Sequence, residues 1–340
     1  MRLKSLLKKL IPSLRVSDQL RSVNEELSLY IDSVKNSSQN SINQLSKRTD
    51  YLFWLSQRKE GESLSDTKKR VFLDLPKAEG DLRCIQLGSN YILQRIKTIC
   101  DNKEIRFSLS GGTILGAVRH QGFIPWDDDI DIAVERADYP RLEAAIKADS
   151  ELTIEHYYTP VGEKTIKVRH KDSEVFWVDV FPFDRVEISP GGYDLAKDQI
   201  AQAHRRLSEE VRAVMMSNKD YSITKKDQPI PALNPIFKEL YHKHKKDTPL
   251  NENGNYCLCS FENYSRPMPL LCEYDSCYPL EKDAVTFEGK QYDAFPDYSH
   301  FLEMNFGDYY SFPPEIVTHV RYHQSLTNEY RFLKKHNIDL

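Results

Sequence analysis

The stretch 108–132 constrains the fold of this chain most, because it joins a glycine pair to closely spaced carboxylates. Apolar and polar residues alternate over 105–110, which predicts a strand, and Gly111 and Gly112 end it. A short helical segment follows, and residues 129–134 predict a second strand. The glycine pair is thus expected at the start of a helix, a short distance upstream of the carboxylates.

Two aspartates alternate with isoleucines in the second predicted strand. Successive side chains of a strand point to opposite faces, so Asp129 and Asp131 share one face while Ile130 and Ile132 pack on the other. Two carboxylates this close repel each other unless a cation lies between them. Because oxygen ligands suit Mg²⁺ or Mn²⁺ better than zinc, we expect one of these two ions.

A third carboxylate comes from an apolar segment farther along the chain. Residues 175–181 predict a strand that Pro182 closes, and Asp179 interrupts its apolar and aromatic residues. An unpaired charge in such a strand is costly. If this strand lies beside the strand of Asp129 and Asp131, all three aspartates hold the metal and form the catalytic centre.

The glycine pair supplies an anion site. A strand that ends in Gly111 and Gly112 and leads into a helix exposes backbone N–H groups to a phosphate, and the Thr113 hydroxyl adds a hydrogen bond. A glycine pair by itself is more often only a turn. Its position upstream of the aspartates favours a phosphate site.

The amino-acid sequence of this region resembles that of the LicD family, which belongs to the nucleotidyltransferase superfamily. The LicD family includes bacterial phosphocholine transferases and the fukutin-related proteins. The resemblance rests on Gly111–Ile132, on the third-carboxylate motif Val178–Asp184 and on short motifs between Phe287 and Pro314. It spans about residues 81–325. It implies an α/β (α+β) fold with a nucleotidyltransferase-type mixed sheet flanked by helices.

The resemblance also implies a reaction. A phospho-alcohol, phosphocholine in the first place, would move from a CDP-activated donor to a hydroxyl of a cell-surface glycan, and CMP would leave. Ribitol or glycerol phosphate could be transferred by the same chemistry. Two alternatives remain open: nucleotidyl transfer from a nucleoside triphosphate, and a scaffold without catalysis in a glycan-assembly complex.

Several polar residues near the motif have two interpretations. Arg119 and His120 are predicted to contact the donor phosphate. Asp127 and Asp128 either support the metal ligands or are solvated loop charges, and solvation is slightly favoured for Asp127.

Residues of the C-terminal region raise two further hypotheses. Glu288 and Asp308 are candidates for acceptor contacts, although structural hydrogen bonds in turns are the favoured alternative. Four cysteines match a four-thiolate zinc site in number, but their spacing is not a standard one, and buried free thiols are favoured. These cysteines are Cys257, Cys259, Cys272 and Cys277.

The first 79 residues predict a helical extension, and residues 80–340 the catalytic domain. Residues 1–14 form a basic amphipathic pattern, which either lies in a membrane interface or docks on the protein itself. Residues 16–52 carry coiled-coil spacing with a phase slip at 35–41, which predicts self-association into a homo-oligomer. A linker is expected at 58–67.

Composition excludes several classes of protein. Of the 340 residues 40% are hydrophobic and 29% charged, which is typical of a globular protein. A net charge of −4 argues against nucleic-acid binding. The six cysteines are sparse and no secretory signal precedes them, so we expect a cytoplasmic protein. The basic segment 1–14 suggests the inner face of the cell membrane and a lipid-linked acceptor.

Overall fold

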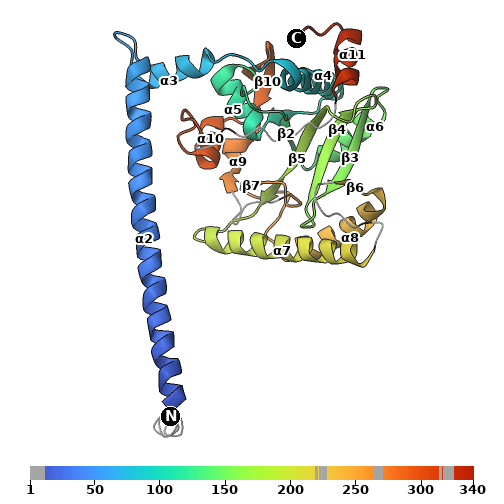
Figure 1. Cartoon of the computed structure of the whole chain (residues 1–340). Coiled ribbons are helices and arrows are strands. Elements are labelled where there is room, and N and C mark those ends of the chain that lie inside the picture. The colour runs from blue at the N-terminus through green and yellow to red at the C-terminus, as the bar shows by residue number, and fades with distance from the viewer. Residues whose placement is uncertain (1–11, 219–220, 222–227, 264–270, 314–315, 317–324) are drawn as a thin grey trace. The chain divides into compact units, whose positions relative to one another are not determined.

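In a computed structural model of the chain, the described residues are 12–218, 221, 228–263, 271–313, 316 and 325–340 (Figure 1). They form two compact units, Met1–Val71 and Phe72–Leu340. The sequence instead predicted a boundary between residues 79 and 80. In the described part of the chain, no helix is both long enough and apolar enough to cross a membrane.

The first unit is built on one long helix, α2 (Pro12–Gln57). The helix continues without a break through residues 35–41, where a phase slip was predicted. Among its described side chains, coiled-coil positions such as Val34, Leu45 and Leu52 are exposed. Most of the predicted amphipathic segment 1–14 lies outside the described residues.

The predicted linker 58–67 is shorter than expected. Helix α3 (Leu64–Leu73) begins inside it, because the Ser63 hydroxyl accepts a hydrogen bond from the Asp66 N–H at 3.1 Å and caps the helix. Arg70 then pairs with Glu62 at 2.7 Å, which ties this helix to the turn before it.

The second unit contains a mixed sheet of eight strands, in the order β1-β2-β5-β4-β3-β6 with β7 and β8 added beside β5. Strands β2 and β5 run parallel, and the other neighbours run antiparallel. The strands are β1 (Phe107–Leu109), β2 (Asp131–Glu135), β3 (Leu152–Tyr158), β4 (Lys164–His170), β5 (Trp177–Val186), β6 (Gln228–Pro229), β7 (Tyr256–Cys259) and β8 (Leu271–Glu273). The predicted α/β class with a mixed sheet is confirmed.

Helices and a hairpin surround this sheet (Figure 1). Helices α7 and α8 pack on each other with β3 and the end of β5, in a hydrophobic core of their own. The helices are α4 (Gly80–Lys103), α5 (Gly111–His120), α6 (Tyr139–Lys147), α7 (Tyr193–Ser217), α8 (Asn234–Lys245), α9 (Tyr274–Cys277), α10 (Tyr298–Phe306) and α11 (Thr327–Lys335). The 3₁₀ turn η2 (Pro231–Leu233) precedes α8, and β9 (Glu281–Phe287) and β10 (Lys290–Ala294) form the hairpin.

The main core lies between α4 and the sheet. Ile85, Ile92 and Ile96 lie at helical spacing and are buried in the same cluster as Val178 and Val180 of β5. Each such side chain stabilises the fold by about 1.5–3 kcal/mol when it is fully buried. The apolar face of β5 is therefore fixed toward α4, and its other face is left for the site.

Strand β5 does not end at Pro182, contrary to the prediction. On one side it pairs with β4 through residues 177–179 and with β7 through residues 183–186. Pro182 lies in the gap between these two partners, where no N–H is needed for a ladder hydrogen bond. The strand therefore passes through the proline.

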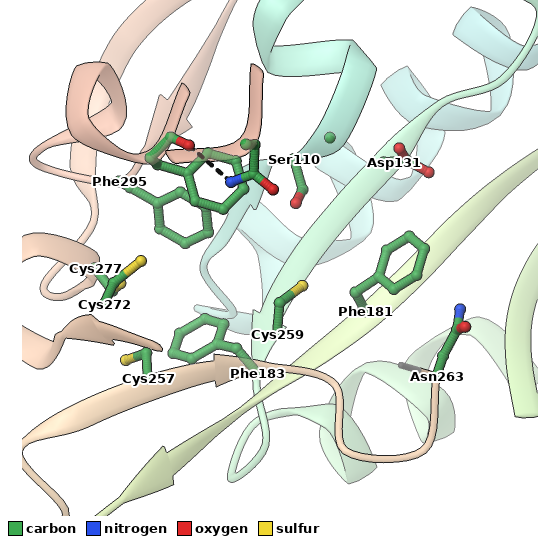
Figure 2. A pocket seen from close by; sticks show the side chains of 13 residues that line it. Ser110, Asp131, Phe181, Phe183, Cys257, Cys259, Asn263, Cys272, Cys277 and Phe295 are labelled. Carbon is green, nitrogen blue, oxygen red and sulfur yellow. Dashed lines mark hydrogen bonds between the residues drawn. The ribbon is translucent and has the colours of Figure 1, made fainter. Parts of the chain in front are cut away.

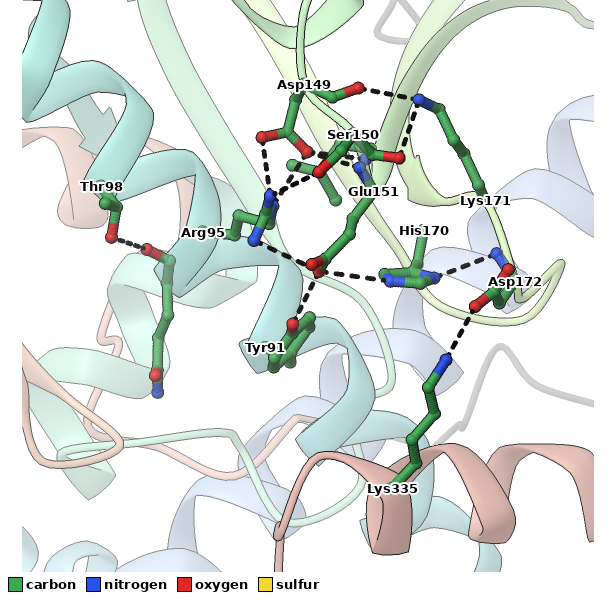
Figure 3. A network of polar contacts seen from close by, with 12 residues as sticks. Tyr91, Arg95, Thr98, Asp149, Ser150, Glu151, His170, Lys171, Asp172 and Lys335 are labelled. Carbon is green, nitrogen blue, oxygen red and sulfur yellow. Dashed lines mark hydrogen bonds and ion pairs between the residues drawn. The ribbon is translucent and has the colours of Figure 1, made fainter.

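A polar network joins α4 to the start of β3 (Figure 3). Arg95 donates to both carboxylate oxygens of Asp149 at 2.9 Å, and the Tyr91 hydroxyl donates to Glu151 at 2.8 Å. Lys335 of α11 reaches the turn after β4 through an ion pair. These contacts hold the helices in place over the core.

Candidate active site

The three predicted aspartates meet on one face of the sheet. Asp131 lies opposite Asp179 in the parallel pair β2–β5, and Lys167 lies opposite Asp179 in the antiparallel pair β4–β5. Strand β2 begins at Asp131, so Asp129 belongs to the preceding loop rather than to the strand. One carboxylate oxygen from each aspartate lies within 4.8 Å of the other two. We call Asp129, Asp131 and Asp179 the carboxylate cluster.

This cluster concentrates negative charge in a buried place. Burial raises the pKa of Asp131 well above its usual range, and the charges of Asp129 and Asp179 raise it further. Burial also raises the pKa of Asp179 to about 6, although Lys167 opposes the shift. Burial and mutual repulsion thus both disfavour the charged carboxylates, and a divalent cation would offset both. A ligand set of carboxylate oxygens suits Mg²⁺ or Mn²⁺.

Lys167 was not predicted from the sequence. Its ammonium lies 3.1 Å from Asp179 Oδ1, and the ring of Trp177 lies 4.8 Å from the same ammonium. Trp177 Nε1 also donates to Asp179 Oδ2 at 3.0 Å. Alternation in residues 164–170 predicts the strand but not its partner, so only the register shows that Lys167 faces the cluster.

The glycine pair opens the N-terminus of α5 toward the cluster. Gly111 has a φ of +52°, and a Cβ there would collide with Asp131 Oδ2. A Cβ at Gly112 would lie 2.7 Å from Asp127 Oδ2. The Thr113 hydroxyl accepts a hydrogen bond from the Asp131 N–H at 2.7 Å. The structure therefore brings Gly111, Gly112 and Thr113 against the carboxylates.

A cavity of about 290 Å³ opens beside this helix end (Figure 2). Asp131, Gly111 and Ser110 line one part of it, and aromatic and cysteine side chains line most of the rest together with Asn263 and Asn305. A group attached to a phosphate at the N-terminus of α5 could therefore enter the cavity.

Comparisons with known proteins match this region. Residues 104–210, which contain the whole carboxylate cluster, match the family described as LicD/FKTN/FKRP, nucleotidyltransferase domain. This part of the chain is therefore similar to the LicD family. The chain is 29% identical over 265 residues to the lipopolysaccharide cholinephosphotransferase LicD of Haemophilus influenzae, covering 69% of this chain and 93% of that protein.

A second relative is the human ribitol 5-phosphate transferase FKRP. It is 28% identical over 107 residues, which cover 30% of this chain and 21% of FKRP. Both relatives are named as phosphotransferases, which supports a LicD-type transferase activity. The shared part with FKRP is confined to a limited segment, whereas the match to LicD extends over most of both chains.

The structure does not bring Arg119 and His120 to the carboxylate cluster. They end α5, about 12 Å along the helix from Gly111 at 1.5 Å per residue. Arg119 Nη1 donates to the Tyr309 carbonyl at 2.9 Å, and His120 Nδ1 donates to the Phe72 carbonyl at 2.7 Å. Burial lowers their pKa values, to about 10 for Arg119 and about 4 for His120.

These contacts give both side chains a structural role. A phosphate at the N-terminus of α5 would reach Arg119 and His120 only if they left their main-chain partners. Their contact with the donor phosphate therefore stays a prediction that this arrangement does not favour.

Asp127 is partly exposed and Asp128 is buried, so neither is a fully solvated loop charge. Asp127 lies over Gly112, and burial, Asp129 and Asp128 raise its pKa well above the usual range. Asp128 is buried, with 3% of its surface exposed. Gln86 fixes the loop by donating to the Asp127 carbonyl at 2.8 Å. The interpretation that they support the metal ligands is the one that fits this position.

Glu288 has the structural role that the sequence favoured. It lies at the turn between β9 and β10, where it pairs with Arg83 at 2.7 Å and Lys77 at 3.2 Å. Asp308 accepts a hydrogen bond from the Ser311 hydroxyl at 2.8 Å. An acceptor contact by either residue stays a prediction.

The four candidate zinc ligands are free cysteines. Cys257 and Cys272 face each other across β7 and β8. Within the described ranges, the aspartates form the one group of at least three side chains close enough to hold a metal, and the cysteines form none. Burial raises the pKa of the Cys259 thiol to about 12. Zinc binding by the four cysteines stays a prediction.

Proposed function

We propose that this chain transfers phosphocholine from a CDP-activated donor to a hydroxyl of a cell-surface glycan, with release of CMP. The observation that carries the proposal is the carboxylate cluster against the glycine-lined N-terminus of α5. The long match to the lipopolysaccharide cholinephosphotransferase LicD favours choline as the alcohol. Transfer of ribitol or glycerol phosphate by the same chemistry is the second candidate, favoured by the shorter match to FKRP.

The proposed reaction is an in-line displacement at the phosphorus that carries the alcohol. The acceptor oxygen forms a new P–O bond, and the bond from this phosphorus to the bridging oxygen breaks. The bridging oxygen leaves with its electron pair as part of CMP, and the acceptor proton passes to a base. Backbone N–H groups at Gly112 and Thr113 would donate to phosphate oxygens at the helix N-terminus.

Asp129, Asp131 and Asp179 would hold Mg²⁺ or Mn²⁺, because their oxygens converge and repel one another without a cation. Bound there, the ion would neutralise the diphosphate and polarise the attacked phosphorus. Lys167 would hold Asp179 in place through the ion pair at 3.1 Å.

Product analysis tests the proposal. The full chain is incubated with Mg²⁺, a glycan acceptor and, in parallel, CDP-choline, CDP-ribitol, CDP-glycerol or CTP. We expect CMP release and acceptor labelling with CDP-choline. Pyrophosphate release from CTP would instead establish nucleotidyl transfer. If glycan modification in cells is unchanged by Asp131→Asn, the chain is a scaffold rather than an enzyme.

The N-terminal region suggests where this reaction takes place. We propose that the basic segment 1–14 attaches the protein to the inner face of the cell membrane, near a lipid-linked acceptor. Vesicles of anionic lipid should retain the full chain better than a chain that lacks these residues. Equal retention would remove the membrane proposal and leave the catalytic one intact.

Self-association is proposed for α2, because apolar residues at coiled-coil spacing are exposed along it. Sedimentation equilibrium should show an oligomer that Leu45→Glu with Leu52→Glu dissociates. A monomer at micromolar concentration would contradict this proposal.

A further inference from the structure

Strand β5 carries an aromatic surface directly beside the carboxylate cluster. Alternation places Phe181 and Phe183 on the same face as Asp179. On the neighbouring strand, the residue opposite Phe181 is Ala133, whose methyl group leaves space above the sheet. On this face of β5, the carboxylate of the proposed metal site is thus followed directly by two phenyl rings.

These rings form part of the cavity of about 290 Å³ (Figure 2). Phe295 and Phe301 line it from the segment before α10 and from α10 itself, with ring centres 5.1 Å apart. Phe183 and Phe295 meet edge to face, with ring centres 6.2 Å apart. The volume is close to the lower end of ligand pockets, which span about 300–1,000 Å³, so it suits a small group rather than a whole nucleotide.

The side chains that line the cavity favour a ligand group whose positive charge is surrounded by apolar methyl groups. Among the described residues that line the cavity, Asp131 is the one carboxylic acid, and none is a lysine, arginine or histidine. Besides Asp131, the polar side chains that line it are Ser110, Asn263 and Asn305, and the Asn305 amide already donates to the Phe301 carbonyl at 2.7 Å. Along the phenyl rings a polyol would leave hydroxyl groups without hydrogen bonds, which costs binding energy. A quaternary ammonium group needs no hydrogen bonds and is attracted to ring faces.

We propose that this cavity binds the trimethylammonium group of the donor alcohol and that Phe181 sets the preference for choline. The inference rests on the proposed function, because it places the donor phosphate at Gly111 and Asp131, where the cavity opens. Phe181 is the ring that follows the cluster on β5, two residues after Asp179. It is therefore a specificity residue rather than part of the metal site.

A pair of ligands of equal shape isolates the role of charge. The full chain with Mg²⁺ is titrated calorimetrically with phosphocholine and with the phosphate ester of 3,3-dimethylbutanol, in which carbon replaces the charged nitrogen. We expect the wild type to bind phosphocholine about tenfold more tightly, as a cation near ring faces would. Phe181→Leu should lose most of this preference, and Phe181→Tyr, which keeps the ring, should retain it.

A purely structural role of Phe181 would weaken both ligands equally and leave their ratio unchanged, which would overturn the assignment. Equal binding of the two ligands by the wild type would overturn the cation site itself. If Phe181→Leu does not fold, Cys259→Phe provides the second test by filling the cavity. It should abolish phosphocholine binding and retain CMP binding, and retained phosphocholine binding would contradict the proposal.

The outcomes separate this inference from the proposed function. A charge preference that depends on Phe181, without CMP release from CDP-choline, would uphold the cavity and reject the transfer reaction. CMP release from CDP-choline with no charge preference would uphold the reaction and reject the cavity as the choline site.

Discussion

Two groups of acidic side chains lie on β2, β5 and the loops beside them, and the protein neutralises them differently. In the carboxylate cluster, three aspartates converge with Lys167 as the cation that contacts Asp179. A few residues farther along, Arg136 binds both oxygens of Asp184 at 2.9 and 2.8 Å and reaches Glu262 at 2.8 Å. We call Arg136, Asp184 and Glu262 the arginine cluster.

The pKa values express this difference. Burial alone would raise the pKa of Glu262, but the charge and hydrogen bonds of Arg136 outweigh it and lower the value to about 2. Burial raises the pKa of Asp179 to about 6, and Lys167 only partly offsets it. The arginine cluster therefore stabilises the fold, whereas the carboxylate cluster costs stability until a cation binds.

The largest expected effect is the loss of activity when a residue of the carboxylate cluster is replaced. Asp131→Asn removes a ligand of the proposed metal, so CMP release should fall by about 10⁴-fold. The same change removes one of three carboxylates that repel one another, so the free energy of unfolding in EDTA should rise. Urea denaturation of the metal-free protein measures this, and a clear loss of stability would remove the contrast between the clusters.

The next effect concerns stability. Arg136→Met leaves two buried carboxylates without their partner, which should lower the free energy of unfolding by about 3–4 kcal/mol. Arg141→Met is the matched control, because Arg141 pairs with Asp138 at the surface and should cost less than about 0.5 kcal/mol. Equal effects in urea denaturation would contradict the role assigned to the arginine cluster.

A smaller effect appears in the pH dependence. The pKa of Glu262 is lowered in the folded protein, so its contribution is present above its ordinary value of 4.5 and is lost as the pH falls toward 2. Between pH 5 and pH 3, the stability advantage of the wild type over Glu262→Gln should shrink by about 2 kcal/mol. Chemical denaturation at both pH values measures the difference, and a constant advantage would show that Arg136 does not lower this pKa.

The smallest expected effect concerns a third acidic site, Glu288, which lies outside both clusters. Arg83 and Lys77 outweigh the burial of Glu288 and lower its pKa, as in the arginine cluster. Glu288→Gln should lower the free energy of unfolding by about 1 kcal/mol and change kcat/KM by less than about threefold. A large rise in KM for the glycan with unchanged stability would instead support the predicted acceptor contact.

The sequence by itself determined the candidate residues of the carboxylate cluster and the glycine pair, and the family resemblance supplied the fold class. These residues depend on local pattern: alternation fixes the face of a strand, and glycine fixes where a backbone can turn and be approached. The resemblance added the family and the reaction type. The predicted strand boundaries were close to the observed ones, but Pro182 was wrongly predicted to end β5. Whether a strand can contain a proline depends on which strands pair with it on either side.

Tertiary structure decided which distant groups meet. The register of β4 against β5 brought Lys167 to Asp179, and the packing around α5 engaged Arg119 with the Tyr309 carbonyl instead of the site. Both cases involve partners far apart in the chain, and local spacing carries no information about them. Charge and residue type mark the candidates for a site, but only the pairing of strands and the packing of helices decides which charges remain unbalanced and are left for a ligand.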